Sequence, residues 1–339
     1  MPFPHIIFRR AGLVELDTAT VDPVVSSPNE VVVRNRFSLV SAGTELACLA
    51  GLESWFQMPG TPGYIAVGEV VARGEAVARV AEGDLVFTYG PHAGLFKIDV
   101  TNRWGGMCIR VPATLRADFA PFTRMASIAI TSLRVSRIEL GDVVLVMGLG
   151  LVGNLAAQLA ALQGGTVIAA DVSARRRETA LACGVAHVVD STAPGWKDQV
   201  RDLAGRNGIG TLIDATGVSS VIEEASAVVA HQGEVILLGS PRTPHQTDLT
   251  AFLRRTHLPP FVDLKGALEW RFPTYREEFV KHSVERNSEV IMDLLASGRL
   301  RIEPLYTHRL PPSKAPEAYA GLRDHKDNYV GVVFDWSQT

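Results

Sequence analysis

Residues 143–153 read Val-Val-Leu-Val-Met-Gly-Leu-Gly-Leu-Val-Gly, and this stretch decides the fold. The apolar run Val143–Met147 predicts a short buried strand, and three glycines with the spacing G-x-G-x-x-G follow it directly. An Ala- and Leu-rich segment, Asn154–Leu162, predicts the helix that comes next. A strand, a glycine loop and a helix in this order are typical of a dinucleotide-binding turn.

Each glycine of the loop has its own physical task. Gly148 permits the tight turn, Gly150 lets the backbone approach a diphosphate, and Gly153 lets the helix pack closely on the strand. The start of the helix, which includes Leu151 and Val152, then offers N–H groups to the phosphates.

An acidic residue at the end of the next strand indicates which dinucleotide binds. Thr166–Ala170 is short and apolar, and it ends at Asp171. A carboxylate there accepts hydrogen bonds from a ribose 2′-hydroxyl and repels a 2′-phosphate, which favours NAD. Arg175–Arg177 follow closely and leave NADP open, since arginines can bind a 2′-phosphate. We place Arg177 on a solvated helix face and Arg176 along the adenosine.

Further residues complete the expected cofactor site. They are Val172, Thr216, Leu238 and Gly239.

Strand and helix patterns alternate from residue 123 to residue 268. After the glycine loop and Asp171, short apolar runs recur at Leu212–Ile213 and Glu234–Leu238. Buried strands that alternate with helices predict a doubly wound parallel sheet. We therefore assign residues 123–268 to a nucleotide-binding domain.

The two ends of the chain are expected to form the other domain. Residues 1–122 contain β-branched runs at Val31–Arg36, Tyr64–Val71 and Asp84–Tyr89, with Gly and Pro between them, which favours a small barrel or sandwich over helices. Residues 269–339 contain a helical stretch, Ser288–Ala296, and a strand-like stretch, Tyr329–Phe334. This tail is too short to fold alone, and we expect it to complete the first domain.

Composition bounds the remaining classes. The chain has 339 residues, which suits two domains, and its net charge of −3 gives no electrostatic basis for nucleic acid or an anionic membrane as partner. The N-terminal residues lack the long apolar region of a signal peptide, and no apolar run reaches about 20 residues. Three scattered cysteines predict a reducing compartment, the cytoplasm.

The glycine loop, placed well into the chain after a β-rich part, resembles the medium-chain dehydrogenase/reductase superfamily. Ser41–Glu45 resembles its C-G-[TS]-[DE] segment, Gly63–Val70 resembles its G-H-E-x-x-G-x-V strand, and Lys265–Ala267 is similar to the end of its nucleotide domain. The resemblance implies a GroES-like β-rich catalytic domain joined to a Rossmann domain. The first two segments look closest to sugar and cyclitol dehydrogenases and to bacteriochlorophyllide dehydrogenase.

The chain departs from the family at its zinc ligands. Ala42 stands at the position of the family's cysteine ligand, Tyr64 at that of its histidine ligand, and the third position falls at Thr123–Arg124. A catalytic zinc needs about three N, S or O ligands from the protein, and these positions do not supply them. The four closely spaced cysteines of the structural zinc lobe are also missing. We therefore expect neither zinc.

Without a metal, a side chain must handle the proton of the reacting alcohol. Tyr64 inherits the place of the histidine ligand and is the first candidate, with the alternative that its ring only fills space. A nearby cation, Arg124 or Lys97, is expected to lower its pKa. The resemblance implies a proton-relaying hydroxyl at Thr44.

Two more side chains are candidates for the catalytic site. Glu45 either takes part in the reaction directly or holds its loop or an arginine. His92 follows Gly90-Pro91 in a loop, where functional residues concentrate.

The leading hypothesis is a zinc-independent NAD-dependent oxidoreductase that interconverts a secondary alcohol and a ketone on a polyhydroxylated small molecule. A quinone or enoyl reductase that uses NADPH is the alternative, disfavoured by Asp171. A dinucleotide-binding protein without turnover is the third. The resemblance implies a homodimer or homotetramer.

Overall fold

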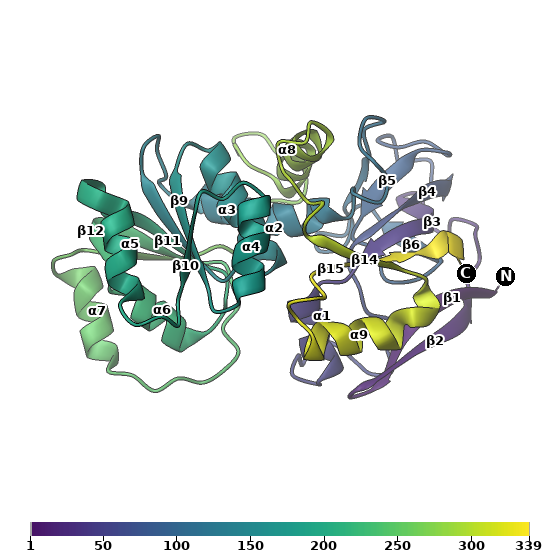
Figure 1. Ribbon diagram of the computed structural model, residues 1–339. Helices are drawn as coiled ribbons and strands as arrows, with labels where there is room; N and C mark the ends of the chain where they lie inside the picture. The colour runs from purple at the N-terminus through teal and green to yellow at the C-terminus, as the bar shows by residue number, and fades with distance from the viewer. Residues whose placement is uncertain (1, 339) are drawn as a thin grey trace. The chain divides into compact units, whose positions relative to one another are not determined.

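The computed structural model describes residues 2–338 and divides the chain into two compact units (Figure 1). The first unit is Met1–Arg124 with Phe272–Thr339, so both ends of the chain build it. The second unit is Met125–Arg271.

The second unit is built on a six-stranded sheet. Its strands are β8 (Val143–Met147), β9 (Thr166–Asp171), β10 (His187–Asp190), β11 (Ile209–Asp214), β12 (Val229–Leu237) and β13 (Asp263–Gly266). They lie in the order β10-β9-β8-β11-β12-β13, and each neighbouring pair is parallel. Counted from β8, this is the doubly wound order 3-2-1-4-5-6, which reverses direction between β8 and β11.

Helices in teal to green pack around this sheet (Figure 1). They are α3 (Leu151–Leu162), α4 (Ala174–Ala182), α5 (Trp196–Ala204), α6 (Ser219–Ser226) and α7 (Leu249–His257), with the short 3-10 turns η1 (Gly205–Asn207) and η2 (Glu269–Arg271). Helix α2 (Phe122–Val135) begins just before the second unit. All five side chains of β8 are buried, because helices cover both faces of the sheet. This burial explains why the strand is apolar throughout.

The glycines of the turn between β8 and α3 differ in how much space surrounds them. Gly148 has a φ of 88°, and its N–H donates to the carbonyl of Ala170 at 2.8 Å. A Cβ placed on Gly153 would lie 1.8 Å from the carbonyl oxygen of Gly148. A Cβ on Gly150 would meet no atom within 4 Å. The loop therefore needs glycine at position 153 for packing and leaves open space at position 150.

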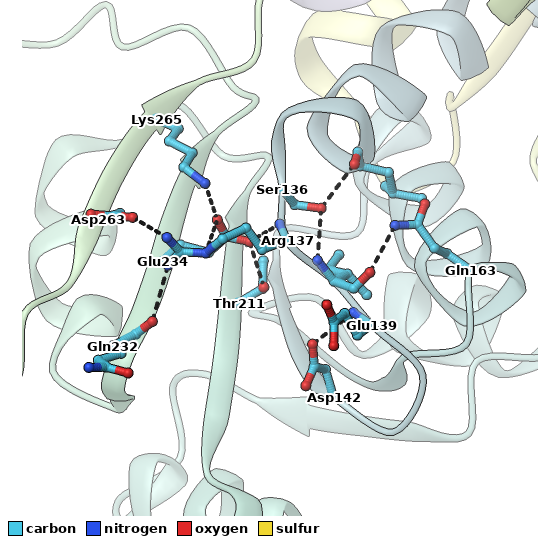
Figure 2. A network of polar contacts seen from close by, with 12 residues as sticks. Ser136, Arg137, Glu139, Asp142, Gln163, Thr211, Gln232, Glu234, Asp263 and Lys265 are labelled. Carbon is cyan, nitrogen blue, oxygen red and sulfur yellow. Dashed lines mark hydrogen bonds and ion pairs between the residues drawn. The ribbon is translucent and has the colours of Figure 1, made fainter. Parts of the chain in front are cut away.

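A buried glutamate joins the strands at the opposite, N-terminal side of this sheet (Figure 2). Glu234 on β12 accepts from the Lys265 ammonium at 2.6 Å, the Thr211 hydroxyl at 3.0 Å and the backbone N–H of Arg137 at 2.8 Å. Three donors satisfy a carboxylate that is only 1% exposed. The acid in an otherwise apolar run is therefore structural.

The first unit holds a seven-stranded sheet and a separate hairpin. The hairpin is β1 (Pro2–Arg10) with β2 (Leu13–Thr20), and the sheet runs β14-β15-β3-β4-β5-β7 with β6 paired to β3. The strands are β3 (Glu30–Leu39), β4 (Ala66–Arg73), β5 (Leu85–Thr88), β6 (Leu95–Asp99), β7 (Cys108–Arg110), β14 (Tyr306–Leu310) and β15 (Gly331–Asp335). The helices are α1 (Ala42–Leu49), α8 (Val284–Ala296) and α9 (Ala315–Asp324), with η3 (Pro312–Lys314) and η4 (Trp336–Gln338).

The expected fold class is confirmed, and two helices were not anticipated. The parallel sheet follows a β-rich part, as predicted. Helix α1 interrupts the β-rich part. It was not predicted because it has only eight residues of modest amphipathicity, which show no clear helical period in the sequence. Helix α9 in the tail packs its buried face, which includes Tyr319 and Leu322, into the apolar core of the first unit. None of the helices among residues 2–338 is both long and apolar enough for a membrane span.

The glycine contact predicts a difference between two matched variants. Gly153→Ala should lower the free energy of unfolding by about 1–3 kcal/mol, because the new methyl group meets a backbone carbonyl that cannot rotate away. Gly150→Ala should change it by less than about 0.5 kcal/mol, since the added methyl lies in open space. Urea denaturation of the cofactor-free variants measures both, and equal stabilities would contradict the close contact.

Candidate functional site

The start of helix α3 has the features of a phosphate-binding turn. Gly150 is the N-cap residue, its backbone is extended, and no side chain caps the helix. The N–H groups of the first turn, from Leu151 to Gly153, therefore have no partner within the helix. The open space at Gly150 lies beside them. Free N–H groups, a helix N-terminus and open space fit a diphosphate.

Asp171 at the end of β9 holds the glycine loop as well as its own turn. Its Oδ2 accepts from the Leu149 N–H at 2.6 Å, and its Oδ1 accepts from the Ser173 N–H at 2.8 Å. A carboxylate has about four acceptor positions, so each oxygen can take one more hydrogen bond. The acid is thus fixed beside the loop and can still bind a ribose hydroxyl.

The three arginines after Asp171 have different surroundings. Arg177 donates to the Asp171 carbonyl at 2.8 Å and to the Asp190 carboxylate at 3.0 Å. Arg176 is half-buried, with its guanidinium 3.9 Å from Asp171 Oδ2, whereas Arg175 is exposed. Neighbouring Val172 is 65% exposed, an unusual position for valine. We placed Arg177 on a solvated helix face, but it ties α4 to β9 and β10.

The ends of β11 and β12 meet the same loop through a second acid. The backbone carbonyl of Asp214 accepts from the N–H groups of Leu238 at 2.9 Å and Gly239 at 2.8 Å. Its carboxylate accepts from the Thr216 hydroxyl at 2.5 Å, and burial raises its pKa. The Thr216 methyl would lie 2.8 Å from a Cβ on Gly148. Of the predicted residues, Thr216 thus borders the glycine loop, and Leu238 and Gly239 are held at the end of β11 by Asp214, which was not predicted.

In the first unit, the Tyr64 hydroxyl lies among three polar groups. It donates to the hydroxyl of Ser41, the N-cap residue of α1, and it also hydrogen-bonds Thr44. The Arg124 guanidinium lies 5.2 Å from the centre of the Tyr64 ring and 4.0 Å from that of Tyr89, whose hydroxyl accepts from it at 2.9 Å. Lys97 lies elsewhere, bonded to the carbonyl of Val24.

The expected lowering of the Tyr64 pKa is wrong in sign. Arg124, Ser41 and Thr44 do favour the phenolate, but desolvation by burial outweighs them and raises the pKa of Tyr64. The phenol therefore keeps its proton through neutral pH. It can donate that proton, and its conjugate base has three stabilising neighbours.

Glu45 and His92 meet in the interior of the first unit rather than at its surface. Glu45 Oε2 lies 3.0 Å from His92 Nε2 and accepts from the Tyr319 hydroxyl at 2.5 Å. Glu45 Oε1 accepts from the Ser41 N–H at 2.7 Å. His92 is fully buried and Glu45 is 2% exposed. Both oxygens accept, as in an ionised carboxylate.

The hydrogen bonds of His92 assign its tautomer. Its Nδ1 lies 2.8 Å from the Ser38 hydroxyl, which also accepts from the Trp336 indole at 2.9 Å. An indole only donates, so the Ser38 proton is available to Nδ1. Nε2 then carries the hydrogen that points to Glu45.

The four predicted catalytic residues thus belong to one connected group, but they differ in how exposed they are. Tyr64 and Thr44 are half-buried, whereas Glu45 and His92 are buried behind them. Ser41, Tyr319 and Trp336 were missed. Ser41 had a signal, since it precedes Thr44 in the quoted segment, but Tyr319 is 274 residues from Glu45 and had none.

The family's metal-ligand positions hold Ala42, Tyr64 and Thr123–Arg124 in this chain. Within residues 2–338, no three His, Cys, Asp or Glu side chains are grouped so that they could hold a metal ion. Burial raises the pKa of the Cys108 thiol to about 12, so this thiol is protonated at neutral pH. The Arg124 cation beside Tyr64 also disfavours a second positive charge there.

Comparisons with known proteins agree on a dehydrogenase relationship. Residues 152–259 match the family described as zinc-binding dehydrogenase. The chain is 24% identical to D-guloside 3-dehydrogenase of Escherichia coli, over 96% of this chain and 97% of that protein. It is 29% identical to 2-desacetyl-2-hydroxyethyl bacteriochlorophyllide A dehydrogenase of Cereibacter sphaeroides, over 97% of each chain.

A solved structure of similar fold carries a bound cofactor. It is a putative zinc-binding dehydrogenase from Sinorhizobium meliloti bound to NADP, with a TM-score of 0.79, 20% identity and coverage of 99% of both chains. At this identity the likeness concerns the fold.

The Asp171 geometry predicts a change in cofactor preference. Asp171→Ala should weaken NAD binding by about 1.5–3 kcal/mol for each lost ribose hydrogen bond, and NADP binding far less. Fluorescence titration with NADH and NADPH measures both affinities. Asp198→Ala is the control, an exposed acid in the first turn of α5, and it should leave the ratio of the two affinities unchanged. Equal losses for both cofactors in Asp171→Ala would mean that this acid does not contact the ribose.

Proposed function

Because the chain is a member of the medium-chain dehydrogenase/reductase superfamily, we propose that it is a zinc-independent, NAD-dependent dehydrogenase. It interconverts a secondary alcohol and a ketone on a polyhydroxylated substrate. The observation that carries the proposal is the Tyr64 hydroxyl, held between Ser41, Thr44 and Arg124 at the place of a family metal ligand.

The preference for NAD is supported by charge. Asp171 would repel a 2′-phosphate, and Arg177 is already bonded to Asp171 and Asp190. Because one structure of similar fold is bound to NADP, the titration compares NADPH with NADH.

The chain's own groups account for binding and for the proton. The first turn of α3 holds the diphosphate, and Asp171 holds the ribose. When bound there, NAD would supply an acceptor for the hydride of the alcohol carbon, and its reduced form would supply a hydride donor for the carbonyl carbon. In the reductive direction Tyr64 donates its proton to the substrate oxygen, and its raised pKa ensures that the proton is present. In the oxidative direction the alcohol proton passes to the phenolate, which forms only as the pH approaches the raised pKa of Tyr64 and which Arg124 stabilises.

The substrate class follows from the relatives. The guloside dehydrogenase is named for a sugar derivative, and another relative, from Escherichia coli, is named L-galactonate-5-dehydrogenase. We extend this substrate class to the present chain. We also propose that the chain forms a homodimer or homotetramer and acts in the cytoplasm. A screen of sugar glycosides, aldonates and cyclitols with NAD, against quinones with NADPH, tests the proposal. Turnover only in the second set would replace it with the C=C reductase, and cofactor binding without turnover in either would leave a non-catalytic binding protein.

The metal content gives one prediction. Elemental analysis of the purified protein should find far less than one zinc per chain, because the ligand positions hold Ala42, Tyr64 and Thr123–Arg124. Turnover should persist after prolonged treatment with a strong chelator. Stoichiometric zinc whose removal abolishes turnover would refute zinc independence.

Tyr64 gives the second prediction. Tyr64→Phe should keep NAD affinity and lower kcat by roughly 10²–10⁴-fold, the worth of a positioned acid or base. Because the pKa of Tyr64 is raised above its ordinary value of 10, reduction by the parent should hold through neutral pH and fall only as pH rises past that raised value. The variant should lack this alkaline fall. A loss below about fivefold, or about 1 kcal/mol, would show that the ring only fills space.

A further inference from the structure

The hydroxyl of Ser41 is the direct hydrogen-bond partner of Tyr64, and the backbone of Ser41 is fixed twice by one residue. The Glu45 N–H donates to the Ser41 carbonyl at 2.9 Å, as the first backbone bond of α1. The Glu45 carboxylate accepts from the Ser41 N–H at 2.7 Å. The N-cap side chain therefore does not cap its own helix and is free to face Tyr64.

Glu45 can hold Ser41 in this way because its other oxygen is anchored. The Tyr319 hydroxyl and His92 Nε2 both approach Oε2, and each of these side chains is almost completely buried. Tyr319 comes from α9 in the C-terminal segment, while Ser41 and Glu45 come from α1. A carboxylate with three donors around it cannot turn without leaving a buried polar group unpaired.

We propose that Ser41 and Glu45 are positioning residues for Tyr64, with Tyr319 and His92 as the buried anchor of Glu45. This inference rests on the proposed function, in which Tyr64 exchanges a proton with the substrate. It changes the roles expected for Glu45 and His92, which act through Ser41 rather than on the substrate.

A serine hydroxyl suits this position because it both accepts and donates. While no substrate oxygen is within reach, Ser41 accepts the single hydrogen of the Tyr64 hydroxyl. When Tyr64 gives the proton to the substrate oxygen and the carbonyl carbon receives a hydride from NADH, the phenolate is left behind. Ser41 then turns its own hydrogen to the phenolate, and solvent later returns the proton to Tyr64. The Tyr64–Ser41 contact persists throughout, so the phenol oxygen keeps its direction.

The charged groups around Tyr64 act in opposite senses. Arg124 favours the phenolate, and Glu45 disfavours it. The Ser41 and Thr44 hydroxyls add to the effect of Arg124. Loss of the Ser41 hydroxyl alone should therefore raise the pKa of Tyr64 further, while its backbone N–H still bonds to Glu45 and preserves the fold.

The decisive variant is Ser41→Ala, and Ser283→Ala is its matched control. Ser283 is also a buried N-cap serine of the first unit, and it accepts the Arg286 N–H at 3.1 Å at the start of α8. The first measurement needs no substrate. The ultraviolet absorbance of tyrosinate, titrated in the full-length protein and in Tyr64→Phe, gives by difference the titration of Tyr64 alone.

Ser41→Ala should move the Tyr64 titration to higher pH and lower kcat by about tenfold, with KM within about twofold. Ser283→Ala should alter neither. Glu45→Gln can accept on one side only, either from the Ser41 N–H or from the Tyr319 and His92 donors, and should lower kcat less than Glu45→Leu, which accepts on neither side and should lose at least as much as Ser41→Ala. If Glu45→Leu does not fold, the Tyr64 titration in Ser41→Ala still tests the proposal.

An unchanged Tyr64 titration in Ser41→Ala would overturn the proposal, whatever the activity. A protein without any dehydrogenase turnover would defeat the proposed function, yet a shifted titration would still establish that Ser41 controls the Tyr64 hydroxyl. The two failures are therefore separate.

Discussion

A buried carboxylate must be surrounded by donors, and the first unit is organised around that requirement at Glu45. Removal of a charge from water costs several kcal/mol unless hydrogen bonds replace the lost hydration. Glu45 gathers its three donors from α1, from the loop that carries His92 and from α9. His92 extends the set to Ser38 on β3 and, through it, to Trp336 near the C-terminus.

The same requirement explains why the C-terminal segment belongs to the first unit. Tyr319 and Trp336 each bring a donor together with a large apolar surface, and both belong to the core that contains Phe8 and Phe334. Their hydrogen bonds select one arrangement among the many that apolar contact alone would allow. The burial of α9 and β15 therefore fixes the position of α1, which carries Thr44 and begins at the N-cap residue Ser41.

The second unit solves a different problem, which is the close approach of backbone to backbone. Gly153 lies against the carbonyl of Gly148, and a Cβ on Gly239 would lie 2.4 Å from the N–H nitrogen of Gly217. Asp171 and Asp214 hold the strand ends around these contacts through backbone N–H groups. Because backbone contacts hold this loop, its unpaired N–H groups are available to a ligand. Such N–H groups suit a diphosphate, which is recognised mainly by its negative charge. In the first unit, by contrast, side-chain hydroxyls and a guanidinium surround Tyr64, and these can respond to a proton that moves.

Local patterns along the chain were enough to predict the elements that form within one turn. The run Val143–Met147, the glycine spacing and Asp171 lie close together along the chain, so their geometry follows from one turn, and the strand, loop and helix were predicted there. The segment that contains Thr44 and Glu45 and the tyrosine at position 64 were also recognisable. The groups that surround these residues come from segments far apart in the sequence. His92 appeared as a loop histidine and is fully buried, and the partner of Glu45 lies 274 residues away. The pKa of Tyr64 rises although Arg124 is close, because burial depends on every segment that covers the ring and no local pattern records that sum.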